Sequence, residues 1–458
     1  MQIVCTTIKA ADRLTYEQIF SILPVCNPAA KRESVNPARG KTIMNDLRTI
    51  RSLDKYLGSI ICFIFDLLGL FKIKKTRTVK NVLVIELFEM GAGIMAYPSI
   101  KYIKEKLDNA NIYCLATNKT KEVWDLLEII PPENILAVND RNLFTFAASL
   151  IKQIIRLRRK KIDLVIDFEL FMRISSIIAF LSGAKLRAGF YRYGIEGLYR
   201  GNFYDFKCCY NQNTHISKNF LALTKAAVNQ CRETPNYKGQ IRTSEITIPA
   251  YKLNPEMRNK IKAQISELYP DYSDEDIILI CPDVGKILSV RNYPADYFVD
   301  VINKLLDRYP DYLVLLTGVK ENNEICSYIK NKTADSRCIN FCGRLKSLRE
   351  LMELMTFSKL LICNDNGPLH FASMTAMKIL ALFSTDSPFV YGPLGDCIIL
   401  YNYFHCSPCI NAFNHKSSPC RNSLCLKSLE PDRVYDFAIK LIEEKPAYRT
   451  INGELPYI

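Results

Sequence analysis

Several features that would mark a special class of protein are scarce in this sequence. Glycine accounts for only 18 of the 458 residues, which excludes a collagen-like fibre with glycine at every third position. No heptad repeat is sustained, so a long coiled coil is excluded as well. The 17 cysteines are too sparse for a small secreted disulfide scaffold. Because 48% of the residues are hydrophobic and 24% are charged, the chain can bury a sizeable core.

A compact signal peptide and a long apolar run are also missing. The first 30 residues are only moderately apolar and lack a cleavage pattern. The longest apolar run, residues 56–71, contains Asp66 and is shorter than the roughly 20 residues that a bilayer-spanning helix needs. We therefore expect a cytoplasmic protein. A start at Met44 is compatible with the sequence too, since residues 1–43 contribute no recognisable element.

The apolar run has two remaining interpretations, which stay open at this point. It is either a helix packed on the domain that follows, or a helix lying in the plane of a membrane, with the basic segment 72–77 as its flank. The net charge of +14 bears on this choice, because residues 31–80 carry an excess of eight positive charges. Such a patch favours an anionic membrane surface or nucleic acid as a partner. No nucleic-acid-binding module interleaves aromatic and basic residues here, so we expect no nucleic acid partner.

From Asn81 onward, short apolar runs alternate with helical patterns, which predicts parallel sheets covered by helices. The strands expected in the first half are 81–86, 111–117, 135–138 and 163–168. After a polar stretch with one expected strand at 246–248, the strands expected in the second half are 276–281, 312–316, 359–363 and 378–383. The predicted organisation is an N-terminal extension (1–78), a first doubly wound domain (79–235), a linker (236–273), a second doubly wound domain (274–445) and a tail (446–458).

A glycine turn follows the first expected strand and opens a helix. Residues 91–96 fit G-x-G-x-x-A, a pattern that also occurs in dinucleotide-binding proteins. Those proteins carry an acidic residue at the end of the second strand to bind the ribose. The second strand here ends at Thr117 and Asn118, without a carboxylate, so a dinucleotide oxidoreductase is a weak alternative.

Polar residues also follow three strands of the second half, at the edge where ligands bind in such sheets. Lys286 and Arg291 lie in a basic loop and could reach a phosphate group. Gly318 follows a strand, with the carboxylates Glu321 and Glu324 nearby. The third stretch contains Asp365, Asn366, Gly367 and His370 at a strand-to-helix turn.

A cluster of cysteines lies near the C-terminus. Cys406, Cys409, Cys420 and Cys425 have a spacing compatible with a structural zinc site. Free thiols in a surface loop, or one or two disulfides, are the alternatives. Single cysteines inside apolar runs, such as Cys62, Cys114 and Cys363, are expected to be buried as small hydrophobic residues.

Taken together, residues 80–440 resemble family nine glycosyltransferases, the bacterial heptosyltransferases of lipopolysaccharide core synthesis. The segment 365–372 is similar to the family signature D-S/T-G-x-x-H-x-A, and 291–294 is similar to its K/R-x-W-P segment. The strand containing Asp167, followed by Arg173, resembles a strand of the family's acceptor domain. The glycine turn with Gly91 and Gly93, followed by Pro98, also matches.

This resemblance implies a GT-B type fold of two Rossmann-like domains facing a cleft. The first domain would hold the acceptor, with Gly91, Gly93, Asp167 and Arg173 on that side. The second would hold a nucleoside-diphosphate sugar. Arg291, Asn366 and Gly367 would contact the diphosphate, Asp365 and His370 would position sugar and phosphates, and Glu321 or Glu324 would bind the ribose. The implied reaction is an inverting, metal-independent transfer of a sugar, heptose from ADP-heptose in the first instance, to a lipid-linked or lipopolysaccharide-core acceptor.

One departure from the family pattern concerns the catalytic base. The family has Gly-Asp seven and six residues before its proline, and here those positions hold Gly91 and Ala92. Alanine cannot accept a proton, so the resemblance leaves Glu89 as the expected base and Glu86 as the second choice. A non-catalytic sugar-nucleotide-binding protein is the alternative function that Ala92 suggests.

Overall fold

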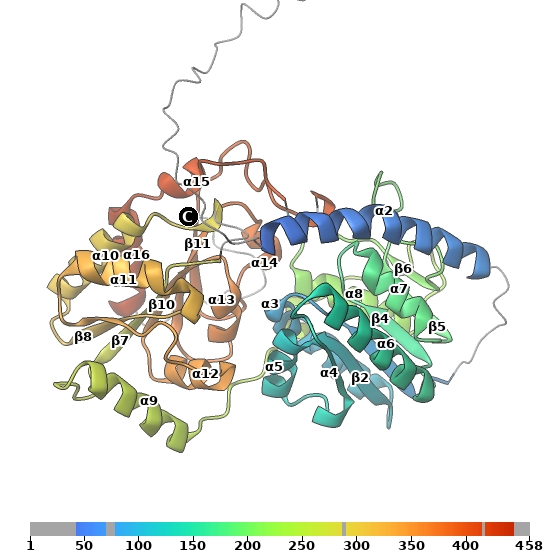
Figure 1. Cartoon of the computed structure of the whole chain (residues 1–458), viewed down its shortest axis with the longest axis horizontal. Coiled ribbons are helices and arrows are strands. Elements are labelled where there is room, and N and C mark those ends of the chain that lie inside the picture. Colours follow the sequence, from blue (N-terminus) through green and yellow to red (C-terminus); the bar gives the residue numbers. More distant parts are fainter. Residues whose placement is uncertain (1–42, 70–77, 286–289, 415–416, 444–458) are drawn as a thin grey trace, which may run out of the picture. The chain divides into compact units, whose positions relative to one another are not determined.

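The computed structural model describes residues 43–69, 78–285, 290–414 and 417–443. The chain divides between Asp46 and Leu47, and the description below concerns the unit Leu47–Ile458. This unit contains two six-stranded sheets with helices on their faces (Figure 1). The α/β class and the two Rossmann-like sheets predicted from the alternation of strands and helices are confirmed.

The first sheet is built from the N-terminal half and all its strands are parallel. The strand order is β3-β2-β1-β4-β5-β6, which places β1 and β4 at its centre. Its strands are β1 (Asn81–Ile85), β2 (Asn111–Thr117), β3 (Ile135–Val138), β4 (Leu164–Asp167), β5 (Leu186–Phe190) and β6 (Phe206–Cys208). Both faces are buried, because alternate residues of β1 join two different hydrophobic clusters.

Helices cover both faces of this sheet. Those on one face are α3 (Met90–Met95), α4 (Tyr97–Lys106), α5 (Asn118–Leu127) and α8 (Ile216–Val228). Those on the other face are α6 (Leu143–Arg159) and α7 (Arg173–Leu181), together with the preceding helix α2 (Ile43–Gly69). Local sequence fixes where α5 and α6 begin, since the side chains of Thr117 and Asn142 accept hydrogen bonds from backbone N–H groups of the first turn.

The second sheet repeats this architecture in the C-terminal half. Its order is β12-β11-β10-β7-β8-β9, again with all strands parallel. The strands are β7 (Asp276–Cys281), β8 (Tyr312–Leu316), β9 (Cys338–Asn340), β10 (Leu360–Asn364), β11 (Lys378–Phe383) and β12 (Cys397–Tyr401). The helices are α9 (Pro255–Leu268), α10 (Ala295–Arg308), α11 (Asn323–Thr333), α12 (Leu348–Thr356), α13 (Gly367–Ala372), α14 (Pro388–Tyr391), α15 (Leu424–Lys427) and α16 (Pro431–Glu443).

Two details of the sequence prediction differ from the structure. Residues 246–248 do not form a strand, because this isolated short segment, with only two apolar residues, has no neighbouring strand to pair with. The expected linker is not irregular throughout, since it contains α9. This helix is held to α12 by ion pairs of Arg258 with Glu353 and Lys260 with Glu350, at 3.2 and 2.6 Å.

The N-terminal extension is helical where it is described. Helix α2 packs on the first half of the molecule, and no helix in the described ranges is long and apolar enough to cross a membrane. Lys72–Arg77, the expected basic flank, lies outside the described residues.

Candidate active site

The turn after β1 carries the two candidate base residues in different environments. Glu86 is buried, and its Oε1 accepts a hydrogen bond from the backbone N–H of Glu89 at 3.1 Å. Glu89 is exposed and stands at the N-terminus of α3. A carboxylate at this position is stabilised by the helix dipole. Glu86 therefore shapes the turn, while Glu89 has the access to solvent that proton transfer to a substrate requires.

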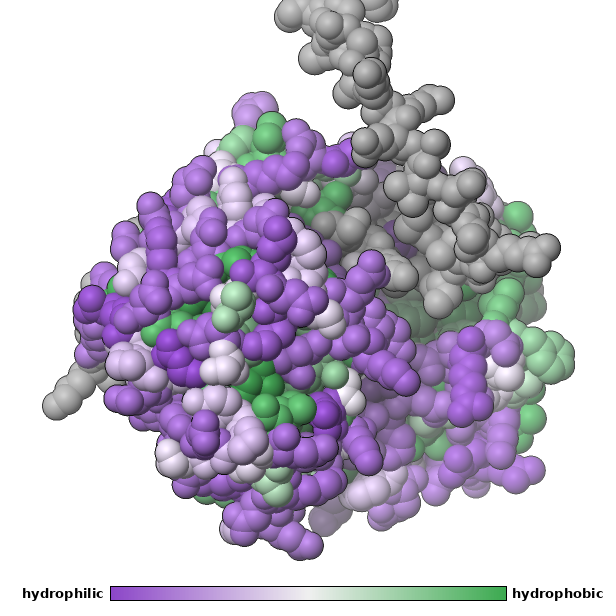
Figure 2. Space-filling view, turned by 60° about the vertical axis from the view of Figure 1, so that its left-hand side comes forward, coloured by the Kyte–Doolittle hydropathy of each residue, from purple (hydrophilic) through white to green (hydrophobic). Residues whose placement is uncertain are grey.

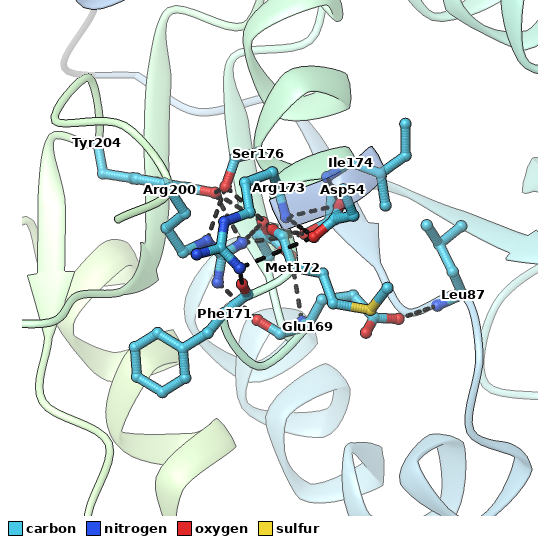
Figure 3. A network of polar contacts seen from close by, with 12 residues as sticks. Asp54, Leu87, Glu169, Phe171, Met172, Arg173, Ile174, Ser176, Arg200 and Tyr204 are labelled. Carbon is cyan, nitrogen blue, oxygen red and sulfur yellow. Dashed lines mark hydrogen bonds and ion pairs between the residues drawn. The ribbon is translucent and has the colours of Figure 1, made fainter. Parts of the chain in front are cut away.

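A second buried carboxylate, which the sequence prediction missed, supports the same turn. Glu169 Oε1 accepts hydrogen bonds from the backbone N–H groups of Leu87 and Phe88 at 2.7 and 3.2 Å. The hydroxyl of Thr120 donates to the Leu87 carbonyl at 3.1 Å. Figure 3 shows Glu169 between Leu87 and the polar network around Arg200. The turn is thus held from both sides, which fixes the position of Glu89.

Asp167 and Arg173, expected on the acceptor side, are both buried in that network. Arg200 forms an ion pair and a hydrogen bond with Asp167 Oδ2, and the Tyr204 hydroxyl donates to the same oxygen at 2.7 Å. The guanidinium of Arg173 donates to three backbone carbonyls. The structure therefore gives both residues a supporting position beneath the sheet edge, with Asp167 also accepting from the Glu169 N–H at 3.1 Å.

The signature segment of the second half lies at the end of β10. Asn364 is fully buried; its amide accepts from the Tyr293 N–H at 3.1 Å and donates to the Pro282 carbonyl at 2.9 Å. Asn366 donates to the Asp283 carbonyl at 3.3 Å. These bonds tie the loop after β7 to the loop after β10, so that the two loops form one surface at the carboxyl edge of the sheet.

Arg291 is brought to this surface and is held there by two carboxylates. Its guanidinium forms an ion pair with Asp365 at 3.5 Å and both an ion pair and a hydrogen bond with Asp386. Asp386, in the loop after β11, is almost fully buried and was not predicted. Arg291 Nε, Asp386 Oδ1 and Thr385 Oγ1 are buried without a hydrogen-bond partner in the described part of the chain, which is unusual for native polar groups.

The two halves meet where the glycine turn touches the signature helix. Helices α3 and α13 are in contact, and a Cβ atom added to Gly91 would lie 2.3 Å from Cδ2 of His370. Only a glycine allows this approach. A second contact joins His215 Nε2, at the start of α8, to the carbonyl oxygen of Gly392 at 3.0 Å. Burial lowers the pKa of His215 to about 4, so the ring is neutral and Nε2–H is the donor.

Tyr391 links these groups electrostatically. Its hydroxyl lies 3.2 Å from that of Tyr210. Burial raises the pKa of Tyr391, the negative charges of Glu89 and Asp365 raise it further, and the charge of Arg291 opposes them. Charged residues from both halves therefore act on one hydroxyl, that of Tyr391.

Other predicted site residues lie apart from this group. Glu321 and Glu324 are exposed after β8, at the start of the short helix η4 (Lys320–Asn322) and in the first turn of α11. Gly318 accepts a hydrogen bond from the Gly343 N–H at 2.9 Å. Gly93 packs against Val123 on the far side of α3. Lys286 lies outside the described residues.

The described residues give no support to the zinc interpretation of the cysteine cluster, which stays a prediction. None of the His, Cys, Asp and Glu side chains in the described ranges form a group of three or more that could hold a metal. The four thiols are free, with Cys406 exposed and Cys425 buried. The Cys420 sulfur accepts a hydrogen bond from the backbone N–H of Ser423 at 3.4 Å. Nearby backbone N–H groups lower the pKa of this thiol. The burial predicted for Cys62, Cys114 and Cys363 is confirmed.

A separate hollow is found at a different place in the described part of the chain. A space of about 510 Å³ lies beside α4 and α5, where residues 249–252 pass from one half to the other. None of the candidate site residues line it, and its walls include Lys101, Lys104, Lys252 and Arg349.

Comparisons with known proteins agree with the fold. The sequence pattern of glycosyltransferase family 9 (heptosyltransferase) matches residues 150–417, more than half of the chain. A lipooligosaccharide heptosyltransferase 2 of Campylobacter jejuni is 25% identical over 159 residues, 34% of this chain and 48% of that protein. The chain thus spans about half the length of the curated relatives that it matches.

Solved structures show the same fold over a larger part of the chain. The ADP-heptose lipopolysaccharide heptosyltransferase II of E. coli has a TM-score of 0.59 at 16% identity, covering 79% of this chain and 98% of that one. A family 9 glycosyltransferase of Veillonella parvula has a TM-score of 0.61 at 18% identity, covering 80% and 98%. With the family pattern matching over more than half of its length, this chain belongs to glycosyltransferase family 9, the heptosyltransferase family.

Proposed function

We propose that this protein is an inverting, metal-independent glycosyltransferase that moves a sugar from a nucleoside diphosphate to a lipopolysaccharide-core or other lipid-linked acceptor. Heptose from ADP-heptose is the first donor to test, because the matched Campylobacter protein is named a heptosyltransferase and a structural neighbour from E. coli was solved with ADP. The observation that carries the proposal is the contact of the Gly91 turn, which follows Glu89, with the His370 helix, which follows Asp365.

The proposed reaction is a single displacement at the anomeric carbon. An acceptor hydroxyl attacks this carbon as the bond to the diphosphate breaks, and the diphosphate leaves with the electron pair. Glu89 accepts the hydroxyl proton as a general base. Arg291, held by Asp365 and Asp386, stabilises the negative charge that develops on the diphosphate. Two of the buried polar atoms without partners in the described part of the chain, Arg291 Nε and Thr385 Oγ1, can donate hydrogen bonds, which is consistent with a site that an anionic ligand completes.

The two halves take different substrates in this proposal. The first sheet, with the turn of Glu89, holds the acceptor, and the second sheet, with Asp365, Asn366, Gly367 and His370, holds the donor. Glu321 or Glu324 remains the proposed partner of the ribose. A lipid-linked acceptor places the working enzyme in the cytoplasm, at the inner surface of an anionic membrane, without a nucleic acid partner. Transfer that continues unchanged in excess EDTA is the result expected for a metal-independent reaction.

The test compares matched glutamate variants in a sugar-transfer assay. We expect Glu89→Gln to lower kcat about 10²- to 10⁴-fold, the usual contribution of a general base, with little change in donor affinity. Glu122→Gln, another exposed glutamate, serves as control and should retain full activity. Full activity of Glu89→Gln would reject it as the base, and loss in Glu86→Gln alone would transfer that role to Glu86.

The alternative function follows from Ala92, which occupies the position of the family's usual acid. If the purified chain binds nucleotide sugars but releases no nucleoside diphosphate with any acceptor, it is a non-catalytic sugar-nucleotide-binding protein.

A further inference from the structure

Helix α2 has its polarity reversed relative to an ordinary surface helix. A helix on a globular protein turns its apolar side inward and its polar side to solvent. In α2 the residues facing the protein include two aspartates, Asp54 and Asp66, and the small residues Gly58 and Cys62. Nine large apolar residues face outward, while Phe65 faces the protein. Both the polar residues on the inner side and the apolar residues on the outer side therefore need an explanation.

The inward side is attached to the first half by specific polar contacts. The Asp54 carboxylate accepts hydrogen bonds from the backbone N–H groups of Arg173 and Ile174 at 2.8–3.2 Å and so caps α7 (Figure 3). Asp66 accepts from the Asn202 N–H at 2.5 Å and from the Tyr199 hydroxyl. Cys62 is fully buried. The helix is therefore docked in one fixed rotation.

Close packing reinforces this docking. A Cβ atom at Gly58 would lie 2.7 Å from Cβ of Arg173, so the helix approaches α7 as closely as a glycine permits. Phe65 stacks on Phe180 of α7 with 4.2 Å between ring centroids. With the rotation fixed on the inner side, the outer side cannot turn inward to bury its apolar residues.

That outer side is a broad apolar face. It consists of nine large hydrophobic residues, each 38–65% exposed: Ile50, Leu53, Tyr56, Leu57, Ile60, Phe63, Ile64, Leu67 and Leu68. At 3.6 residues per turn they cover roughly 140° of the helix circumference. Elsewhere the surface differs: the side of the molecule seen in Figure 2 is mostly hydrophilic with small apolar patches. An apolar face of this extent marks an interaction site.

The charges around this face are positive. Between Ile50 and Gly69, the acidic residues are Asp54 and Asp66, both turned inward, while Arg51 and Lys55 are exposed. Helix α6 packs in the same hydrophobic cluster as α2 and repeats the pattern, with Leu143, Phe144, Ile151 and Ile155 exposed. This helix contains four cations, Lys152, Arg156, Arg158 and Arg159, and no acidic residue.

We propose that the outer face of α2, assisted by α6, binds the surface of an anionic lipid bilayer with α2 lying in the membrane plane. Apolar and aromatic side chains would enter the boundary between headgroups and acyl chains, and the flanking cations would attract the anionic headgroups. A second copy of this chain fits less well. The apolar arc of α2 is wider than the narrow seam of a two-stranded coiled coil, and the cations of α6 would face each other across such an interface.

The position of α2 determines which part of the protein would lie beside the membrane. Asp54 caps α7, which begins a few residues after the carboxyl end of β4. That end carries Asp167 and Glu169, the residues that support the Glu89 turn. A membrane bound to α2 therefore lies beside the proposed acceptor side of the site. The proposal itself concerns lipid binding and does not depend on the transfer reaction.

The test is co-sedimentation of the full chain with vesicles. We expect binding to vesicles of phosphatidylethanolamine and phosphatidylglycerol, weaker binding to pure phosphatidylcholine, and a decrease with salt. The triple variant Leu57→Glu, Ile60→Glu and Ile64→Glu should lower vesicle partitioning at least about tenfold, because three apolar side chains no longer enter the bilayer. Leu253→Glu, a change of another exposed leucine, is the control and should bind as the unmodified chain does.

Each other outcome overturns the proposal. These are absence of vesicle binding, binding that the triple variant retains, and a dimer in lipid-free buffer that the triple variant abolishes. Because all three positions are exposed, circular dichroism of the triple variant should show an unchanged fold. If the triple variant nevertheless unfolds, the single variant Ile60→Glu replaces it in the test and should also weaken vesicle binding. Transfer to a water-dispersed acceptor should be equal in all variants, so a failure of the proposed reaction is distinguishable from a failure of lipid binding.

Discussion

At the scale of single residues, the main cation of the candidate site is held in place by ion pairs with two carboxylates. Arg291 lies between Asp365 and Asp386, and Asp386 is the more buried of the two carboxylates. A guanidinium with fixed orientation can meet a diphosphate without first losing conformational freedom. Asp386 is thus a positioning residue, which acts on the donor through Arg291.

Replacing this carboxylate should weaken donor binding more than it slows the chemical step. We expect Asp386→Asn to raise the donor KM about tenfold, because Arg291 loses its strongest partner, while kcat changes less. Steady-state kinetics with the donor as varied substrate checks this. Asp335→Asn, which removes the ion pair with Arg337, is a matched control away from the site. A normal KM in Asp386→Asn would show that Arg291 keeps its position without this carboxylate.

His215 makes a different prediction, on stability. Its pKa is about 4 in the folded protein, below the ordinary value near 6.5. The unfolded chain therefore binds the proton more readily, and the free energy of unfolding falls as pH decreases from about 6.5 to about 4, by an amount on the order of 3 kcal/mol. Urea unfolding of His215→Gln should show a smaller loss over this window, with the exposed His405→Gln as control. Equal pH dependence in all three proteins would contradict the assignment.

At the scale of elements, the contact between α3 and α13 depends on one missing side chain. Gly91 has no room for a Cβ atom beside His370, so the glycine is required by the approach of two helices. The sequence shows only that a glycine occurs in this turn. It does not show the close approach to His370, and a dinucleotide-binding pattern would explain the same glycine.

A methyl group at Gly91 should therefore push the two helices apart. We expect Gly91→Ala to lower kcat/KM at least about tenfold, since a displacement near 1 Å is enough to disturb reacting groups. Gly194→Ala, at a glycine with open space around it, should be neutral. Transfer assays on both proteins decide the matter. Wild-type kcat/KM in Gly91→Ala would mean that the observed contact is not part of the working enzyme.

The elements themselves were largely predictable. Strands β2, β3, β7, β8 and β11 have the predicted bounds, because buried parallel strands are continuous apolar runs between turn residues. Strands β5, β6, β9 and β12 were missed, and two of them, β6 and β9, have three residues each and lie at sheet edges. Such short edge strands depend on pairing with distant neighbours and leave little local pattern. The rotation of α2 could not be predicted, since the sequence alone does not show which side of it is docked.

The site was predictable in part for the same physical reason. Motif residues that follow strands, such as Asp365 and His370, could be placed at the sheet edge from sequence alone. Asp386 and Glu169 act through long-range contacts with Arg291 and with the Leu87 backbone, and nothing in their local sequence marks them. The predicted domain boundaries, and the roles of the site residues, stay predictions.

At the scale of the whole molecule, the two halves, each built on a parallel sheet, contact each other through a small set of residues. The glycine turn, His215 and Tyr210 come from the first half, and His370, Gly392 and Tyr391 come from the second. In the proposed function, a ligand held by the second half lies near the base candidates of the first. The central claim of the proposed function is that the second half binds the donor while the first half supplies the base.

The most direct test of that claim is donor binding and turnover in one purified protein. Isothermal titration with ADP-heptose, GDP- and UDP-sugars and NAD, followed by measurement of nucleoside diphosphate release when a lipopolysaccharide-core acceptor is added, covers both halves. We predict that a nucleoside-diphosphate sugar binds, that Arg291→Ala abolishes this binding, and that the diphosphate is released only with acceptor. Binding of NAD alone, or sugar-nucleotide binding unaffected by Arg291→Ala, would contradict it.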